Sequence, residues 1–287
     1  MRREEEALIT NTARRWIWLI VLMGAVYAVG YLSVYFSDSS FDIQSGEPLV
    51  FADFWQFWAA GGMLAEHPAS AVYDPVAFER WQLNLLGGEG EIYPMPYPPS
   101  MLLLVRPFAL LPYGFSAIVW LGLSLGLVLW VQERKERGAL PVLLFLCAPA
   151  VLVNVILGQN GFFTAALLLL GVRWMRTAPL LAGFAFGLLT MKPQLGIMIP
   201  VALLASGSWR VILSAVGTSI GMVCISSGVF GPDIWLHYLE MASNVSQQAA
   251  NSSSDSGFAN LQAGVGFQAM MLGFPSALAI ALQAVVT

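Results

Sequence analysis

The residue best suited to acid–base chemistry is Asp53, which lies among large aromatic side chains in the segment Phe51-Ala52-Asp53-Phe54-Trp55-Gln56-Phe57-Trp58. Aromatic neighbours withdraw a carboxyl group from water, which raises its pKa and suits it to act as a general base near neutral pH. Asp is also a preferred helix N-cap, so a capping role is the alternative. A helix that begins near Asp53 would place Phe54, Phe57 and Trp58 on one face, and such a face suits a membrane interface.

Two short polar breaks interrupt the apolar second half of the chain, at Gly158-Gln159-Asn160 and at Met191-Lys192-Pro193-Gln194. Non-helical backbone at membrane depth persists only where protein or water satisfies its polar groups. We therefore expect both breaks to line a cavity. A cation at such a position is a candidate for binding an anion, and snorkelling of Lys192 at a helix end is the alternative.

The elements that must position these residues follow from composition. Hydrophobic residues form 57% of the chain and charged residues only 10%, against about 25% charged in a soluble domain. Most of the surface must then face lipid. The net charge of -4 and the lack of a basic stripe exclude a nucleic-acid partner. With two Cys and two His in the chain, we expect no metal site.

Apolar runs of helical length predict an all-α integral membrane protein, a polytopic helical bundle that forms a single transmembrane domain over residues 1–287. The first run follows Arg14 and Arg15 and is expected to be a retained signal anchor. A stretch at Met101–Leu111, broken by Arg106-Pro107, is expected to lie at the interface or to re-enter. The predicted spans are Trp16–Phe36, Tyr113–Val131, Ala139–Leu157, Gly161–Val172, Pro179–Met191, Leu195–Ala205, Val211–Phe230 and Ala263–Val286.

The distribution of Lys and Arg predicts the orientation. With the N-terminus in the cytoplasm, ten of the 13 basic residues fall on the cytoplasmic side, and only Arg80, Arg106 and Lys192 fall outside. Cytoplasmic loops carry the excess of basic residues. This topology puts a long loop at 37–100, both polar breaks and a loop at 231–262 on the extracytoplasmic side of a plasma membrane.

The order of these features along the chain resembles a known family. Asp53 in its aromatic segment is followed by Val72-Tyr73-Asp74, by Tyr97-Pro98-Pro99 and then by the two polar breaks. This order is similar to that of the glycosyltransferase family 87 membrane proteins, which include polyprenyl-phosphate-mannose-dependent α-mannosyltransferases. The resemblance covers residues from about 50 to 270. It rests on the order of the motifs, since each motif by itself is common.

The resemblance implies a bundle of GT-C type whose long first extracytoplasmic loop carries interfacial helices. It implies the inverting transfer of a hexose, with mannose foremost, from a polyprenyl-phosphate donor to a lipid or glycan acceptor. The chain has no Asp-x-Asp pair, so we expect no cofactor, although some relatives of this architecture use a metal. Asp53 matches the loop Asp that is taken as the base in this family. Family members usually have more helices, so the sequence could be a partial one.

The same resemblance suggests roles for the other polar residues. Lys192 is the candidate partner of the donor phosphate, and Gln159, Asn160 and Gln194 are candidates for hydrogen bonds to sugar hydroxyls or phosphate. Satisfaction of the broken-helix backbone is the alternative for these amides. Further candidates are Tyr97, whose proline-rich segment could instead be a rigid lead-in, Arg106, which could instead anchor at the interface, and His237.

Two other classes of function remain open at this point. Short, interrupted helices also build transport sites near the membrane midplane, so a multi-span transporter or flippase of a lipid-linked or small polar substrate is the main alternative. The polar breaks lie on one side and no internal repeat is evident, which disfavours transport. A scaffold subunit of a membrane complex would instead have Asp53 facing lipid or a partner protein.

Overall fold

Helices form the regular structure of the described residues. The computed structural model describes residues 18–19, 22–23, 25–26, 29–30, 32–37, 39–44, 49–132, 139–196 and 198–251. Apart from one isolated bridge between Ser40 and Leu49, every element in these ranges is a helix, which confirms the all-α class for this part of the chain. The described residues of the predicted first span are helical, and the predicted span at 263–286 lies outside the described residues.

The chain divides into two compact units, Met1–Tyr238 and Leu239–Thr287. The described part of the second unit is a stretch of α13 (Ile234–Asn251). All the candidate site residues belong to the first unit.

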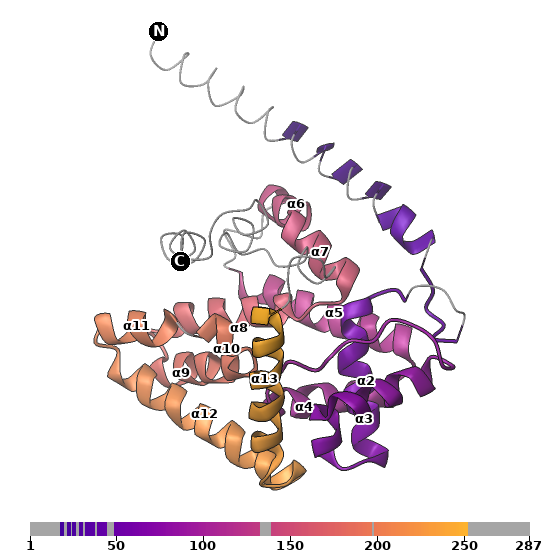
Figure 1. Ribbon diagram of the computed structural model, residues 1–287. Coiled ribbons are helices and arrows are strands. Elements are labelled where there is room, and N and C mark those ends of the chain that lie inside the picture. Colours follow the sequence, from indigo (N-terminus) through magenta and orange to yellow (C-terminus); the bar gives the residue numbers. More distant parts are fainter. Residues whose placement is uncertain are drawn as a thin grey trace. The chain divides into compact units, whose positions relative to one another are not determined.

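The first unit contains a group of short helices between residues 49 and 110 (Figure 1). Asp74 caps one of them, because its carboxylate accepts hydrogen bonds from the amides of Val76 and Ala77, which would otherwise lack an intrahelical partner. The five elements are α2 (Ala52–Glu66), η1 (Ala69–Tyr73), α3 (Pro75–Leu85), α4 (Pro99–Val105) and η2 (Arg106–Leu110).

The aromatic face of α2 is buried in protein, and the expectation that it lies at a membrane interface is wrong. Phe54 is 0% and Phe57 is 1% exposed. Both rings pack against Trp120 of α5, with centroid distances of 5.9 Å and 5.8 Å. The i, i+3 spacing was read correctly, but other helices of the same chain, and not lipid, cover this face.

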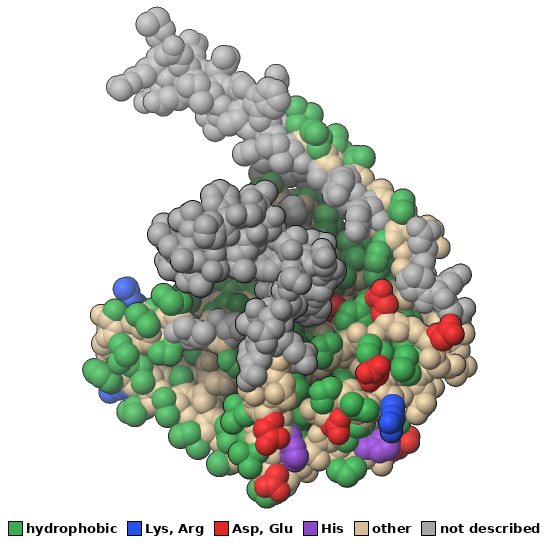
Figure 2. All heavy atoms as spheres, in the orientation of Figure 1, with side chains coloured by type: hydrophobic (Ala, Val, Ile, Leu, Met, Phe, Trp, Pro, Cys, Tyr) green, Lys and Arg blue, Asp and Glu red, His purple; other side chains and the backbone are tan. Residues whose placement is uncertain are grey.

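Among the described residues, two helices are long and apolar enough to cross a membrane, α5 (Tyr113–Val131, 19 residues) and α12 (Trp209–Phe230, 22 residues). At a rise of about 1.5 Å per residue they measure about 29 Å and 33 Å, which matches a hydrocarbon core of about 30 Å. Figure 2 shows hydrophobic side chains over the region of α11 and α12, whereas acidic side chains gather over the region of α2 and α3. The exposed apolar residues of α12 include Leu213, Val216, Ile220, Val223 and Val229.

The predicted span Ala139–Leu157 is two helices in the structure, α6 (Ala139–Leu146) and α7 (Pro149–Leu157). Pro149 lacks an amide hydrogen and keeps Ala148 extended, at φ -67° and ψ 134°, so one helix cannot run through this point. The remaining helices are α8 (Gly161–Trp174), α9 (Pro179–Leu188), η4 (Leu189–Met191), α10 (Pro193–Gly196) and α11 (Met198–Ala205).

Helices α9 and α12 form the most extensive helix pair of the described residues, and two glycines allow their close approach. A Cβ built on Gly183 would lie 2.4 Å from the Ser214 Cβ, and one on Gly187 would lie 2.5 Å from the Thr218 Cβ. Small residues four positions apart are the common device by which helices approach each other in membranes.

Gly187→Ala should therefore destabilise the protein by about 1–3 kcal/mol, the usual cost of overpacking a close contact. Gly221→Ala is the matched control, because α12 leaves open space around Gly221. Alanine should stabilise the helix there by about 0.5–1 kcal/mol. Thermal unfolding in detergent measures both effects, and equal melting temperatures for the two variants would contradict the role of the close contact.

Candidate functional site

Asp53 meets the first polar break through a direct hydrogen bond between side chains. Asp53 lies in the first turn of α2, and Gln159 lies in the turn that joins α7 to α8. The Gln159 Nε2 donates to the Asp53 Oδ2 across 106 residues of sequence. The helix begins at Ala52 with Phe51 as its N-cap, so the alternative role of Asp53 as N-cap is wrong. Its carboxylate is directed instead toward the polar break, as the hypothesis of a shared site requires.

Lys192 of the second break joins the same cluster through Asn160. The Lys192 Nζ donates to the Asn160 Oδ1 over 3.0 Å and lies 5.9 Å from the centre of the Tyr97 ring. The Asn160 side chain also interacts with the Tyr97 phenol, and this interaction acts to lower the pKa of Tyr97. Lys192 is half-buried, and its ammonium contacts side chains of the site, which disfavours the snorkelling alternative.

Burial controls the ionisation of this cluster. Burial raises the pKa of the Asp53 carboxyl, and the hydrogen bond from Gln159 and the charge of Lys192 partly oppose that rise. Burial lowers the pKa of the Lys192 ammonium, against which the charge of Asp53 acts. Burial and the Asp53 charge raise the pKa of Tyr97 to about 12. The arrangement is thus a carboxylate of raised basicity, a nearby cation and a neutral phenol.

Gly158 of the break and Asn154, which the sequence analysis did not single out, shape the turn that carries Gln159. Gly158 has φ +71°, and a Cβ built on it would lie 2.7 Å from the Phe54 Cβ and 2.9 Å from the Phe51 Cβ. Asn154 is buried, and its Nδ2 donates to the Gln159 carbonyl over 3.2 Å.

The Asn154 side chain thus satisfies the polar backbone of the break. This was the alternative role for the side-chain amides of Gln159 and Asn160. The described side-chain contacts of Gln159 and Asn160 lead to Asp53, Lys192 and Tyr97. The signal that could have pointed to Asn154 was its position as an Asn inside an apolar helix, four residues before the Gly at the helix end.

Comparison with known families decides the class of protein. The family model of glycosyltransferase family 87 matches residues 96–287, more than half of the chain. The chain belongs to glycosyltransferase family 87. This family 87 protein is therefore an enzyme that transfers a sugar, and its two span-length helices indicate that it is associated with a membrane.

The family 87 match includes Tyr97, Gln159, Asn160 and Lys192, whereas Asp53 precedes the matched residues. The candidacy of Asp53 therefore rests on its geometry. No curated protein and no solved structure matches this family 87 chain.

Three other candidates stand apart from the Asp53 cluster in this family 87 enzyme. Arg106 is exposed at the start of η2, beside Gly61 of α2, which lies about 12 Å along the helix from Asp53. His237 is exposed in the first turn of α13, and none of its described contacts joins it to the cluster. Gln194 is the second residue of α10, and its side chain lies outside the described residues.

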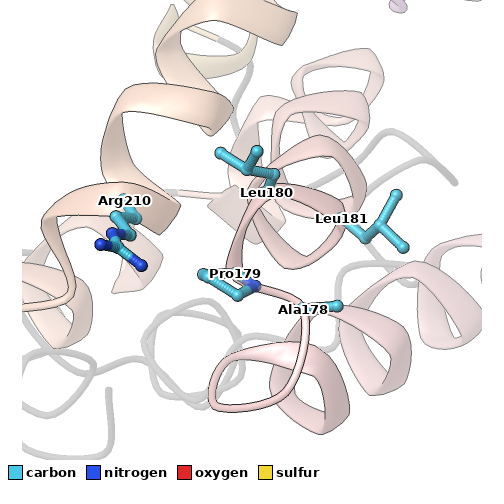
Figure 3. A pocket seen from close by; sticks show the side chains of 5 residues that line it. All are labelled: Ala178, Pro179, Leu180, Leu181 and Arg210. Carbon is cyan, nitrogen blue, oxygen red and sulfur yellow. The ribbon is translucent and has the colours of Figure 1, made fainter.

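A separate cavity of about 500 Å³ lies where α9 and α12 begin, and Figure 3 shows Arg210 on one helix and Pro179 to Leu181 on the other. Its lining is apolar apart from Arg210 and holds no carboxylate, so it has no group for acid–base catalysis. Within the described ranges, no three His, Cys, Asp or Glu side chains lie close enough together to hold a metal ion. The Asp53 cluster is therefore the candidate active site of this family 87 enzyme.

Proposed function

We propose that this protein is a multi-pass membrane glycosyltransferase that transfers a hexose, with mannose foremost, from a polyprenyl-phosphate donor to a lipid or glycan acceptor. The reaction takes place at the extracytoplasmic face and inverts the anomeric carbon. One observation carries the proposal: a half-buried carboxylate, two amides and one ammonium group, from three separate parts of the chain, meet in one cluster.

The chemistry needs one base. As the acceptor oxygen attacks the anomeric carbon, its proton passes to the Asp53 carboxylate. The new glycosidic C–O bond forms on the face opposite the bond to phosphate, which breaks with its electron pair and leaves as polyprenyl phosphate. A single displacement of this kind inverts the configuration. It needs one carboxylate, unlike the pair of a typical glycoside hydrolase.

Lys192 supplies the charge for the departing phosphate. Its ammonium has three donors, of which Asn160 accepts one, so two are available to phosphate oxygens. A phosphodiester donor carries a single negative charge. As the bond to the sugar breaks, the departing phosphate gains one more negative charge at most, which one ammonium can offset. Gln159 orients the Asp53 carboxylate, and Tyr97 lines the cation side of the cluster.

The proposed orientation rests on the ten-to-three division of the basic residues. Lys192 and the loop that carries Asp53 then share the extracytoplasmic side. Family membership favours sugar transfer over the transporter or flippase alternative.

The donor class can be tested with purified enzyme and two radiolabelled donors, polyprenyl-phosphate mannose and the nucleotide sugar GDP-mannose. We expect label to enter acceptor from the lipid-linked donor and not from the nucleotide sugar. Transfer from the nucleotide sugar alone would overturn the donor assignment, and a lipid-linked donor with a different sugar as the better substrate would correct the choice of mannose.

Lys192→Ala should lower kcat/KM for the donor by about 10- to 100-fold, since a hydrogen bond to a charged group contributes about 1.5–3 kcal/mol. Arg80→Ala is the matched control, because Arg80 is an exposed cation of α3 on the same predicted side of the membrane. Steady-state kinetics with varied donor measure both variants. An unchanged kcat/KM for the donor in Lys192→Ala would reassign Lys192 to a structural role.

A further inference from the structure

The segment that leads into Asp53 turns through a strained residue. Phe51 has φ 62° and ψ 44°. Among the described residues, it is the only one other than glycine that has a positive φ. The left-handed conformation costs an ordinary residue about 1–2 kcal/mol, and it persists only where the surroundings hold it. Phe51 stands two residues before Asp53, so this turn sets the direction in which α2 starts and in which its first side chains point.

Tyr113 is the residue that holds this turn. Its hydroxyl donates to the Val50 carbonyl over 2.6 Å and to the Phe51 carbonyl over 3.0 Å. Tyr113 is 4% exposed, and its ring packs edge-to-face against both Trp55 and Trp58, at centroid distances of 5.6 Å and 5.8 Å. Packing of the ring therefore fixes the position of the hydroxyl. The hydroxyl donates to the carbonyls on both sides of the Phe51 Cα.

The same corner supports the partner of Asp53. A Cβ built on Gly158 would lie 2.9 Å from the Phe51 Cβ and 3.3 Å from the Phe51 oxygen. The backbone of Gly158 therefore rests directly on the turn that Tyr113 holds, and Gln159 follows it. Rotation of Phe51 out of its left-handed conformation would move Asp53 and would remove the surface on which the Gln159 turn packs.

We propose that Tyr113 is a positioning residue for sugar transfer: its hydroxyl keeps Phe51 left-handed and so aims the Asp53 carboxylate at Gln159 and the acceptor hydroxyl. The inference rests on the proposed function, in which Asp53 is the base. Tyr113 itself does not touch the reacting atoms. It acts through the backbone, and its effect falls on the chemical step and not on the binding of either substrate.

Tyr113→Phe removes the hydroxyl and keeps the ring. A misplacement of a catalytic group by about 1 Å costs about 100-fold, so kcat should fall by about 10- to 100-fold, with the KM for donor and for acceptor unchanged within about twofold. Ser116→Ala is the control, because it removes a buried hydroxyl from the same helix, together with its hydrogen bond of 2.7 Å to the Phe108 carbonyl, and this hydroxyl bonds neither Val50 nor Phe51. Its kcat should stay within about twofold of the wild type.

A second variant tests the mechanism directly. Glycine adopts positive φ freely, so Phe51→Gly should make the hydroxyl dispensable. In that background Tyr113→Phe should lower kcat by less than about threefold, although the melting temperature still falls. A purely structural tyrosine predicts the same loss of kcat in both backgrounds, and that outcome would overturn the inference. Equal kcat values for Tyr113→Phe and Ser116→Ala would overturn it as well.

Asp53→Asn belongs in the same set of assays, because it separates the two proposals. One pair of results is that Asp53→Asn loses turnover while Tyr113→Phe lowers kcat equally with Phe51 and with Phe51→Gly. That pair of results would remove the positioning role of Tyr113 and would leave Asp53 as the base. Full turnover in Asp53→Asn would remove Asp53 as base, and with it the reason for aiming its carboxylate.

Discussion

Asp53→Asn should lower the rate of sugar transfer by about 100- to 10,000-fold, the usual contribution of a general base, while the protein stays folded. Asparagine has nearly the same size, and its side-chain oxygen can still accept the hydrogen bond that Gln159 donates to Asp53. What is lost is the ability to take a proton from the acceptor hydroxyl. Single-turnover transfer with saturating donor and acceptor measures this step.

Asp74→Asn is the matched control for this substitution. It makes the same change of charge at the N-cap of α3, where Asn and Asp are equally good caps, so both activity and stability should be retained. Retained activity in Asp53→Asn, with the control also active, would remove Asp53 as base. Loss of activity in both variants would point to the general charge of the loop.

The pH dependence of kcat provides a second test of Asp53. The base works when deprotonated, and burial raises its pKa, so activity should fall on acidification at a higher pH than an ordinary aspartate would give. The Lys192 charge holds that pKa down. In Lys192→Ala the acidic limb should therefore move to still higher pH. A limb that stays in place would show that another group controls the profile.

Gly158→Ala should be the most damaging substitution outside the polar cluster. Alanine meets the cost of the left-handed conformation, about 1–2 kcal/mol, and a steric conflict with Phe51 and Phe54 that costs about 1–3 kcal/mol more. The conflict can be relieved only if the turn moves away from α2, and this movement would take Gln159 away from Asp53. We expect kcat to fall by about 100-fold and the melting temperature to fall as well.

Gly207→Ala separates the two costs. Gly207 has φ +63° but no atom within 4 Å of a built Cβ, so alanine there meets only the conformational cost. Its melting temperature should fall less than that of Gly158→Ala, and its kcat should equal that of the wild type. Kinetics and thermal unfolding in the same detergent give both quantities. Equal kcat values for the two variants would show that close packing of the turn on α2 does not matter for the reaction.

Several features of this protein were readable without coordinates because they depend on local chemistry. The apolar run at Tyr113–Val131 has the bounds of α5, since one helix needs only hydrophobic length to be recognised. The polar breaks at 158–160 and 192–194 were located because amides and a lysine are rare in apolar surroundings. Pro149 carried the signal for the division between α6 and α7, which a prediction based on hydrophobic length alone passed over.

Other features depend on contacts between distant segments. Whether the Phe54 and Phe57 face met lipid or protein was decided by Trp120, more than 60 positions away, and amphipathic spacing is the same in both cases. The left-handed conformation of Phe51 was also unpredictable, because a bulky residue adopts it only under tertiary constraint, here the hydroxyl of Tyr113.

The sequence by itself determined which residues could do chemistry, because side-chain type sets what a group can donate, accept or ionise. It also determined that the chain is helical and suited to lipid, because amino-acid composition and the spacing of hydrophobic residues favour such helices within a few turns of chain. Only the tertiary structure decided that Asp53 meets Gln159 and that Asn160 joins Lys192 to Tyr97. These meetings join segments far apart in the chain, and they depend on how closely backbones approach at Gly158, a distance that local sequence pattern does not encode.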